Sequence, residues 1–456
     1  MRVLIHMKPE PDLVAAVIDP ARTVLPRDVA GELPGVELDH DYTPVPIPKP
    51  MPAVPGGDPL SLEQPLTFSM APEHAGVLVR GQIHDFDNAR RIAMLTVARP
   101  DVLQLAADSV IESTPTCGGD PPVGDWREVA GFFAELKSDS LNGTRVPLAI
   151  VDTGINLEFV SDKRDGLAIS LDAQNSWVPP GVTGRPGQFP VAHGSMCAFD
   201  TLIAAPDATL LDLPVLRSQR QGRTVMEGLL SDALAGYSHL LSFLETMPQE
   251  QRKLVVSNSW GSFSPQWDFP PGHPGNYSDN PAHPFNLLVT ALEQAGADIV
   301  FAAGNCGREC PDARCTSTDR PIGGANSHPR VLCIGGVNTQ RDRVGYSSQG
   351  PGRLSQRKPD ICAFTHFSGS EAFGPGTPDS GTSAACPVAA GVVAAIRTQW
   401  SAASISPGEL RTLLRRTADD RGAAGFDYDY GYGVVNVPGI MDALHRRQKN
   451  GRTGGS

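Results

Sequence analysis

The stretch "PDSGTSAACPVAAG", residues 378–391, contains three candidate nucleophiles, Ser380, Ser383 and Cys386. Ser383 directly follows a Gly-Thr turn, and the apolar run after it predicts a helix. A serine at a helix start offers both its hydroxyl and its backbone N–H to a reacting group. Ser380 precedes the turn and is interpreted as a loop serine, whereas Cys386 lies one turn into the helix and should point into packing. We therefore predict that Ser383 is the nucleophile.

A serine nucleophile needs a base that removes its proton and an acid that orients the base. Asp152 ends an apolar strand pattern and is followed by Thr-Gly, so its carboxylate should lie on a turn. His193 begins a helical pattern after a loop, and Gly194 next to it permits close backbone approach. Each motif alone is typical of an ordinary turn or loop. Their joint occurrence with Ser383 favours an Asp, His and Ser catalytic set.

Short apolar strands recur from about residue 146 and alternate with helical patterns. Such alternation predicts an α/β fold, with a doubly wound, mostly parallel sheet that is covered by helices on both faces. Ligands of these folds bind at the carboxyl ends of the strands, where Asp152, Asn258 and Asn305 are expected. The strand patterns are "VPLAIVD", "ATLLDLPVL", "KLVVSNS", "ADIVFAAG" and "RVLCIGGV", and helices are expected at 225–245 and 284–296.

The first 115 residues predict a separate small α+β module. Its strand and helix patterns follow the order βαββαβ, which is that of a split βαβ (ferredoxin-like) unit. We expect strands at 2–7, 35–42, 76–83 and 108–114 and helices at 12–19 and 87–98. The expected division of the chain is an N-terminal module at 1–115, a linker and lead-in helix at 116–145, the main domain at 146–440 and a polar, disordered tail at 441–456.

Composition excludes several classes of protein. The 456 residues carry a net charge of −12, which argues against nucleic-acid binding, and the apolar runs are too short to cross a membrane. The first 17 residues lack the long apolar core of a secretory signal, so a cytoplasmic location is the default expectation. Most of the eight cysteines should then be free thiols.

Three motifs carry a resemblance to a known family. "AIVDTGI", "HGSMCA" and "GTSAACPVAAG" resemble the catalytic motifs of the subtilisin-like serine peptidases (subtilases), in that family's order of Asp, His and Ser. "SNSWG" resembles the family's substrate-binding strand, "FAAGN" the strand that ends in the oxyanion asparagine, and "KPDICAFT" a Pro-Asp segment before the nucleophile. The resemblance covers roughly residues 125–440 and implies a subtilisin-like fold.

The resemblance implies a role for each matching residue. Ser383 would attack the scissile carbonyl, His193 would transfer the proton and Asp152 would orient the imidazole. The Asn305 side chain, with the Ser383 N–H, would bind the oxyanion. Three further residues would pair with the substrate backbone as an added strand, and these are Ser259, Trp260 and Gly261. Asn258 has either a supporting or a purely structural role.

These roles predict a serine endopeptidase that processes intracellular peptides or proteins. Two alternatives stay open: a catalytically silent peptide-binding module, and a transpeptidase or macrocyclase that uses the same acyl-enzyme. Family members often carry a βαββαβ prodomain that blocks the cleft, and residues 1–115 would be either such a prodomain or a permanent regulatory domain. No cofactor is expected to be required. Structural calcium stays open, with "SDKRDG" and "DYDYG" as acidic loops that permit it.

Several cysteines and one loop depart from the family pattern. Cys197 and Cys386 are interpreted as small buried hydrophobes. For Cys306, Cys310, Cys315 and Cys333 we favour free thiols over a disulfide, and a disulfide over a metal site. Residues 262–283 look like an insertion, which would be either a wall of the cleft or a surface loop.

Overall fold

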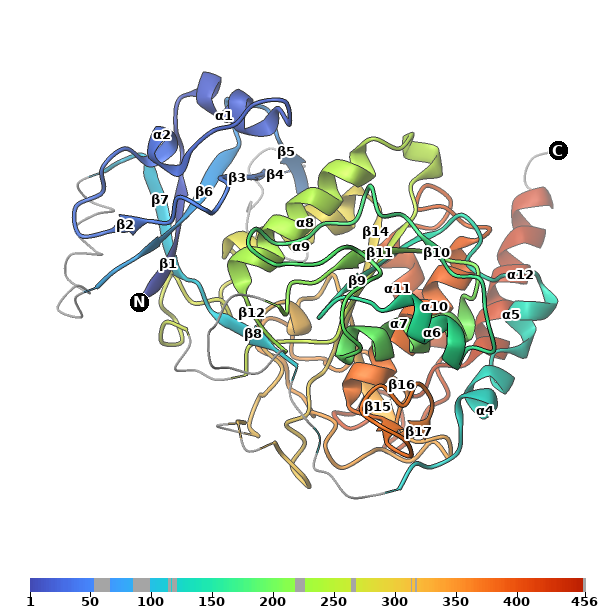
Figure 1. Cartoon of the computed structure of the whole chain (residues 1–456). Coiled ribbons are helices and arrows are strands. Elements are labelled where there is room, and N and C mark those ends of the chain that lie inside the picture. The colour runs from blue at the N-terminus through green and yellow to red at the C-terminus, as the bar shows by residue number, and fades with distance from the viewer. Residues whose placement is uncertain are drawn as a thin grey trace.

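A seven-stranded parallel sheet forms the centre of the larger part of the chain (Figure 1). The computed structural model describes residues 1–52, 66–84, 99–113, 116, 121–217, 226–263, 268–312, 314–315 and 318–453. All neighbouring strand pairs of this sheet are parallel. In spatial order the strands are β10 (Ser170–Leu171), β11 (Thr209–Leu213), β9 (Pro147–Val151), β13 (Leu254–Asn258), β14 (Ala297–Ala302), β15 (Leu332–Val337) and β16 (Ile361–Phe364). The strands β10 and β16 were not expected from the sequence.

Helices cover both faces of the sheet, which confirms the doubly wound α/β fold. Successive side chains of β9 point to opposite faces, so Leu148 and Ile150 pack in one apolar core while Ala149 and Val151 pack in another. This is why the strands are apolar along their whole length. The first core is covered by α4 (Trp126–Gly131), α5 (Ala134–Ser138), α7 (His193–Ala204), α10 (Thr382–Arg397), α11 (Pro407–Thr417) and α12 (Val437–Thr453), with α6 (Leu157–Lys163) beside α7; the second is covered by α8 (Leu230–Glu245) and α9 (Pro284–Ala295).

The N-terminal module contains an antiparallel sheet with the order β2-β6-β1-β7, the strand order of a split βαβ unit. The expected second helix, 87–98, lies outside the described residues. The module consists of β1 (Arg2–Met7), α1 (Pro11–Ile18), α2 (Pro26–Ala30), β2 (Glu37–Leu38), β3 (Val45–Ile47), β4 (Lys49–Pro52), β5 (Leu66–Ser69), β6 (Gly76–Gln82) and β7 (Val102–Ala107).

The expected strand at 108–114 is not part of this sheet. The last strand of the module is β7, and the chain then leaves as β8 (Val110–Glu112), which pairs antiparallel with β12 (Glu227–Leu229) of the larger part. Because β12 takes the start of the run that we expected to be helical from residue 225, the described helix begins only at Leu230. Both differences have one cause, a long-range pairing that local sequence patterns do not report.

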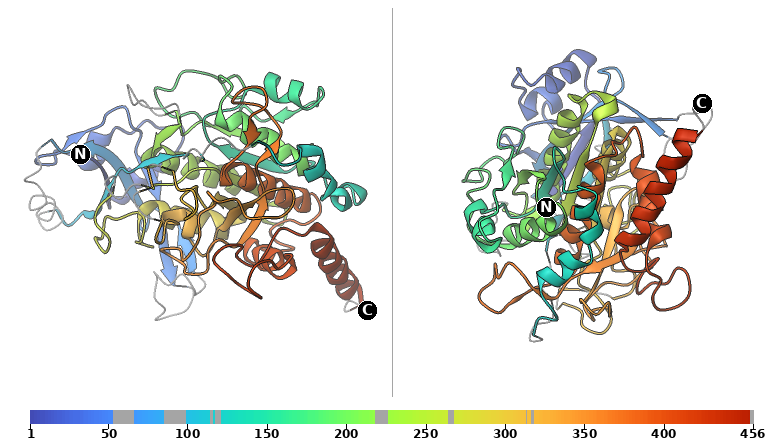
Figure 2. Two further views of the ribbon diagram at one scale, coloured as in Figure 1. Left: turned by 90° about the horizontal axis from the view of Figure 1, so that it is seen from below. Right: turned by 90° about the vertical axis from the view of Figure 1, so that its right-hand side faces the viewer.

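The module packs on the face of the sheet that carries α8 and α9 (Figures 1 and 2). Its side chains Tyr42, Val45 and Ile47 belong to the same apolar core as those two helices. The Tyr42 hydroxyl donates to the Ser231 carbonyl over 2.9 Å, and Nη1 of Arg80 donates to the Ser231 hydroxyl over 3.0 Å. A shared core of this kind holds the module at a fixed place relative to the sheet.

The prediction of a disordered tail from residue 441 is wrong as far as Thr453, because helix α12 continues through it. Helix α12 has an apolar face despite the polar composition of the tail, because Ile440, Met441 and Leu444 are buried in the core at helical spacing. His445 also pairs with Asp139 over 2.8 Å.

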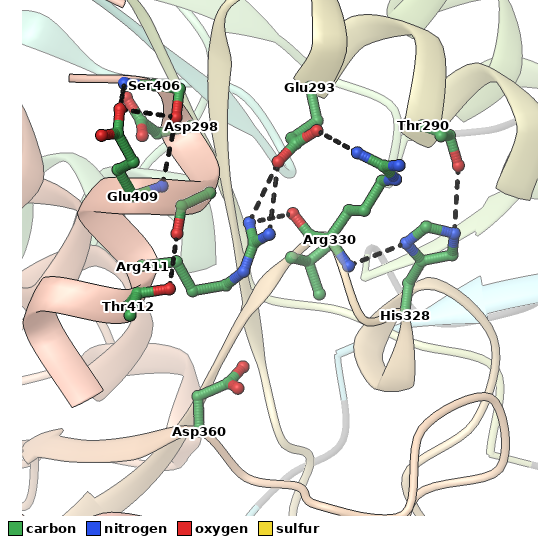
Figure 3. A network of polar contacts seen from close by, with 12 residues as sticks. Thr290, Glu293, Asp298, His328, Arg330, Asp360, Ser406, Glu409, Arg411 and Thr412 are labelled. Atoms are coloured by element: carbon green, nitrogen blue, oxygen red, sulfur yellow. Dashed lines mark hydrogen bonds and ion pairs between the residues drawn. The ribbon is translucent and has the colours of Figure 1, made fainter. Parts of the chain in front are cut away.

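A polar network that includes Glu293, Arg330 and Arg411 ties α9 to α11 (Figure 3). Glu293 on α9 is 4% exposed and accepts hydrogen bonds from Arg330 over 3.1 Å and from Arg411 over 3.3 Å. Arg411 also donates to the Arg330 carbonyl over 2.6 Å. One buried carboxylate therefore compensates two guanidinium groups.

We predict that Glu293→Gln lowers the free energy of unfolding by roughly 2–3 kcal/mol, because it removes the charge of a buried carboxylate that accepts hydrogen bonds from both Arg330 and Arg411. Urea unfolding followed by circular dichroism measures this change. The matched control is Glu37→Gln, whose side chain is 72% exposed and should change stability by less than about 0.5 kcal/mol. Equal effects of the two variants would contradict the role given to the network.

Candidate active site

The three predicted catalytic residues come together at the carboxyl edge of the sheet. Asp152 directly follows β9, His193 is the first residue of α7, and Ser383 is the second residue of α10. All three are buried, with exposed fractions of 1%, 4% and 4%. Residues that are far apart in the chain meet because the ends of parallel strands share one edge.

The carboxylate of Asp152 holds the imidazole of His193. Nδ1 of His193 lies 2.8 Å from Oδ1 and 2.9 Å from Oδ2 of Asp152. The hydroxyl of Thr153 accepts a hydrogen bond from Gly194 N over 2.8 Å and so joins the strand end to the helix start. A Cβ at Gly194 would lie 2.6 Å from the Gly154 carbonyl oxygen, which explains why this position needs glycine. The geometry leaves Nε2 of His193 facing the nucleophile side.

The turn before Ser383 is anchored to Asn305. Gly381 has φ +80°, a conformation that favours glycine, and the backbone N–H of Thr382 donates to Oδ1 of Asn305 over 2.9 Å. The Thr382 hydroxyl donates to the same oxygen over 3.1 Å and accepts from Gly304 N over 2.9 Å. Since its carboxamide oxygen accepts two hydrogen bonds, Asn305 is oriented with its NH₂ group as the donor.

The three predicted substrate-binding residues have different surroundings. Ser259 donates from its hydroxyl to the Ser383 carbonyl over 3.0 Å. Trp260 is buried, and its indole N–H donates to the Val151 carbonyl over 3.0 Å. Of these three residues, Gly261 exchanges backbone hydrogen bonds with another strand segment. Asn258 lies inside the sheet, where its amide donates to two backbone carbonyls, so its contacts are structural.

A segment of the same chain occupies the place beside Gly261. Glu112 N donates to the Gly261 carbonyl over 2.9 Å, and Gly261 N donates to the Glu112 carbonyl over 3.0 Å. On its other side the segment pairs with β12, and Ser113 N donates to the Met226 carbonyl over 3.3 Å. Residues 110–113, which we call the cleft strand, therefore lie between two backbone edges of the larger part.

The cleft strand ends against two of the predicted catalytic residues. The Ser113 hydroxyl lies 2.8 Å from Nε2 of His193 and 3.1 Å from Oγ of Ser383. Within the described part of the chain, no hydrogen bond joins His193 to Ser383 directly. The Ser113 hydroxyl thus stands between His193 and Ser383.

Sequence reasoning missed Ser113, Glu112 and Thr382. The apolar run "SVIES" (109–113) was assigned to the N-terminal sheet, and local pattern cannot reveal a partner more than a hundred residues away. A strand-like segment at the end of a region expected to be a prodomain was the available signal. Thr382 could have been singled out as the hydroxyl residue next to the nucleophile.

The two cysteines near the site are buried free thiols, as predicted for Cys197 and Cys386. The Cys197 sulfur lies 3.6 Å from Oδ2 of Asp152 and 3.7 Å from Nδ1 of His193, a proximity that the sequence did not suggest. Burial raises the pKa of the Cys197 thiol well above its ordinary value, and the Asp152 charge adds to this. The thiol is therefore protonated and inert rather than a rival nucleophile.

The prediction of free thiols after Asn305 is wrong. Cys306 and Cys315 form a disulfide with Cα atoms 5.7 Å apart, and Cys310 is disulfide-bonded as well, whereas Cys333 is a buried free thiol. The composition of residues 306–315 did not show whether their cysteines are free thiols or form a disulfide within the loop.

The described residues of the insertion at 262–283 form a hydrogen-bonded loop beside the N-terminal module. Asp268 accepts from Tyr277 N and Ser278 N, and Gln104 of β7 donates to the Pro274 carbonyl over 2.6 Å. His283 is buried and caps α9 by accepting from Phe285 N over 3.2 Å. Residues 264–267 lie outside the described part.

The acidic loops considered for calcium do not gather ligands. Among the described residues, the one group of three His, Cys, Asp or Glu side chains close enough to share an ion is Asp152, His193 and Cys197. Asp165 instead pairs with Arg127 over 3.2 Å, and Asp427 accepts from backbone N–H groups of its own turn. Within the part of the chain that the structure describes, the Asp and Glu side chains of these two loops therefore form no cluster of three that could share an ion.

Comparisons with known proteins agree with this architecture. A sequence model described as the subtilase family matches residues 143–433. The chain is 27% identical to the serine protease AprX of Bacillus subtilis over 348 residues, which cover 66% of this chain and 68% of AprX. It is 25% identical to subtilisin E of the same organism, with 66% and 67% of the two chains covered. It is 24% identical to a calcium-dependent protease of Nostoc, with 65% and 46% covered.

Two carboxyl groups near the turn before Ser383, those of Asp379 and Asp200, are buried. Asp379, the second residue of β18 (Pro378–Asp379), which pairs with β17 (Phe367–Ser368), accepts from the N–H and the hydroxyl of Ser370, both over 2.6 Å. Burial raises the pKa of Asp379 to about 6. Burial also raises the pKa of Asp200 on α7, and the charge of Asp379 adds to that rise.

We predict that Asp379 makes the protein less stable as the pH rises from about 4 to about 6. The ordinary pKa of an aspartate is 3.8, so between that value and about 6 the folded state binds more protons than the unfolded state. The free energy of unfolding should fall across this range, and Asp379→Asn should remove that part of the fall. Urea unfolding at pH 4.5 and pH 7 measures it.

The matched control for this test is Asp162→Asn, since the Asp162 side chain is exposed. The control should keep the pH dependence of the wild-type protein. A pH dependence of Asp379→Asn that equals that of the wild type would contradict the account.

Proposed function

The chain belongs to the subtilase family and is a serine protease, and we propose that it cleaves internal peptide bonds through an acyl-enzyme on Ser383, with His193 as base and Asp152 as its partner. The observation that carries this proposal is the line of hydrogen bonds from Asp152 through His193 and the Ser113 hydroxyl to Ser383. A substrate carbonyl that replaced the end of the cleft strand would meet the same two groups.

The proposed reaction has two halves. Ser383 Oγ attacks the scissile carbonyl carbon while its proton moves to Nε2 of His193, and the Asp152 carboxylate stabilises the imidazolium. The developing oxyanion accepts from the Ser383 N–H at the start of α10 and from the Asn305 NH₂ group. His193 then delivers the proton to the leaving amine, and a water repeats the sequence on the acyl-enzyme.

We propose further that residues 1–115 act as an inhibitory prodomain, with the cleft strand in place of a substrate. Three features support this: the strand pairs with Gly261 on one side, with β12 on the other, and ends on His193. Peptides bind to sheet edges in this way, and main-chain hydrogen bonds supply the affinity. The natural substrates are peptides or proteins that can displace this strand.

Neither a requirement for calcium nor the location of the protein follows from the proposed reaction. One relative is named a calcium-dependent protease, but the described side chains offer no carboxylate cluster for calcium, so no step is assigned to it. No described helix combines the length and apolarity that a membrane span needs. A cytoplasmic location remains an expectation from the sequence, and the Cys306–Cys315 disulfide counts against it because such bonds persist mainly in oxidising compartments. Cell fractionation decides this question.

We predict that Ser383→Ala abolishes peptide cleavage and labelling by a fluorophosphonate. Asn305→Ala should keep the label but lower kcat by about 10²–10³-fold, the loss known for a subtilisin that lacks such a donor. Ser380→Ala is the matched control, since Ser380 lies three residues away and should leave both readouts unchanged. Continued labelling or cleavage by Ser383→Ala would refute the proposed function.

We also predict that Ser113→Ala raises the rate of fluorophosphonate labelling by roughly tenfold. The change removes a hydroxyl that bonds both His193 and Ser383, and such bonds contribute on the order of 1 kcal/mol each. Ser109→Ala is the control, because the described contacts of Ser109 do not include the catalytic residues. A labelling rate that does not change in Ser113→Ala would show that the hydroxyl does not restrain the nucleophile.

A further inference from the structure

The cleft strand places a carboxylate against a guanidinium of the larger part. Glu112 is fully buried, and its Oε2 accepts from Nη1 of Arg314 over 2.6 Å. Arg314 is 28% exposed at its side chain and is steadied by a second bond, from Nε to Oδ1 of Asp312 over 3.0 Å. A buried carboxylate is costly unless it is paired, so Arg314 is what permits an acidic residue at this place in the cleft.

Arg314 is held at a fixed distance from the oxyanion residue. It directly precedes Cys315, which is bonded to Cys306, the residue after Asn305. Asp312 N also donates to the Asn305 carbonyl over 3.2 Å. The disulfide closes the loop at its base and so restricts how far the Arg314 backbone can move from Asn305.

Backbone pairing determines which side chain meets Arg314. Glu112 exchanges both of its backbone hydrogen bonds with Gly261, and the next residue, Ser113, contacts His193 and Ser383. Any extended peptide that pairs with Gly261 in this register places its corresponding side chain at Arg314. We call this substrate position the Gly261 position.

We propose that Arg314 is a specificity-determining residue that selects glutamate or aspartate at the Gly261 position, so that acidic peptides are the preferred substrate class. This inference rests on the proposed function, because it concerns the substrates of the same site. Glu112 is the internal copy of that preferred residue.

The other charged groups that act on Glu112 have the opposite sign to Arg314. Glu227, which lies opposite Glu112 in the β8–β12 pairing, and Asp312 are both acidic. Burial raises the pKa of Glu112 to about 7, the Arg314 charge opposes this rise, and these two carboxylates add to it. Because its other charged neighbours are acidic, Arg314 is the group that attracts a substrate carboxylate here. The test is done at pH 8, where that carboxylate is ionised.

The test uses the full-length protein and two peptides, acyl-Val-Ile-Glu-Ser-Ala-p-nitroanilide and its Gln counterpart. Both peptides compete with the same cleft strand, so the ratio of their kcat/KM values does not depend on how many clefts are open. We expect the kcat/KM of the wild type to be about tenfold higher for the Glu peptide than for the Gln peptide, because a hydrogen bond between charged groups contributes about that much. For the Arg314→Gln variant we expect the two kcat/KM values to be about equal. Arg314→Lys should keep part of the preference.

Arg308→Gln is the matched control, since Arg308 is exposed on the same disulfide-closed loop and should keep the wild-type ratio. Equal use of the two peptides by the wild type, or an Arg314→Gln variant that loses both activities in proportion, would overturn the proposal.

A binding measurement separates this proposal from the proposed function. Fluorescence anisotropy with labelled Val-Ile-Glu-Ser and Val-Ile-Gln-Ser peptides and the Ser383→Ala protein reports the same ratio without catalysis. A preference for Glu there, in a protein whose wild type cleaves neither peptide, would sustain the role of Arg314 while refuting the proposed hydrolysis.

Discussion

The close contact between α10 and α7 is the constraint on which the site depends. Every residue of α10 is buried, and a Cβ on Gly391 would lie 2.2 Å from the Thr201 carbonyl oxygen of α7. The two helices carry Ser383 and His193 at their first turns, so the spacing of the helices sets the spacing of the proposed nucleophile and base. Small residues along "SAACPVAAG" permit this approach, because close packing leaves no room for larger side chains. The same stretch of sequence therefore provides both the small residues that the helix packing requires and the serine that the proposed chemistry requires.

The same geometry explains how the N-terminal part of the chain can restrain the site. A parallel sheet leaves the ends of its strands open, and the backbone at Gly261 offers hydrogen bonds that its own sheet does not use. The cleft strand fills this edge, and its Ser113 hydroxyl lies where the base and the nucleophile would otherwise meet. The shared core around Tyr42 and Ile47 supports the module that delivers the strand. The proposed restraint would thus depend on the docking of a whole module rather than on one contact.

How much the sequence could predict depends on the range of the interactions. That Asp152, His193 and Ser383 lie together could be predicted because each belongs to a local motif, and the apolar strands could be predicted because both faces of a parallel sheet are buried. The β8–β12 pairing and the Cys306–Cys315 disulfide were missed because the local sequence around each segment or cysteine does not indicate which partner it pairs with. The end of α12 was missed for another reason, since Met441 and Leu444 in a polar tail continue the buried face that Ile440 begins.

The central claim is that residues 110–113 lie in the cleft as an added strand on Gly261. Hydrogen–deuterium exchange of the full-length wild-type protein, read by mass spectrometry on peptides that cover 109–113 and 259–263, tests it most directly. The account predicts slow exchange at both segments, and fast exchange at 109–113 once a peptide aldehyde bound to Ser383 displaces the strand. Fast exchange at 109–113 before any ligand is added would contradict it, because the amide of Glu112 would then not be bonded to Gly261.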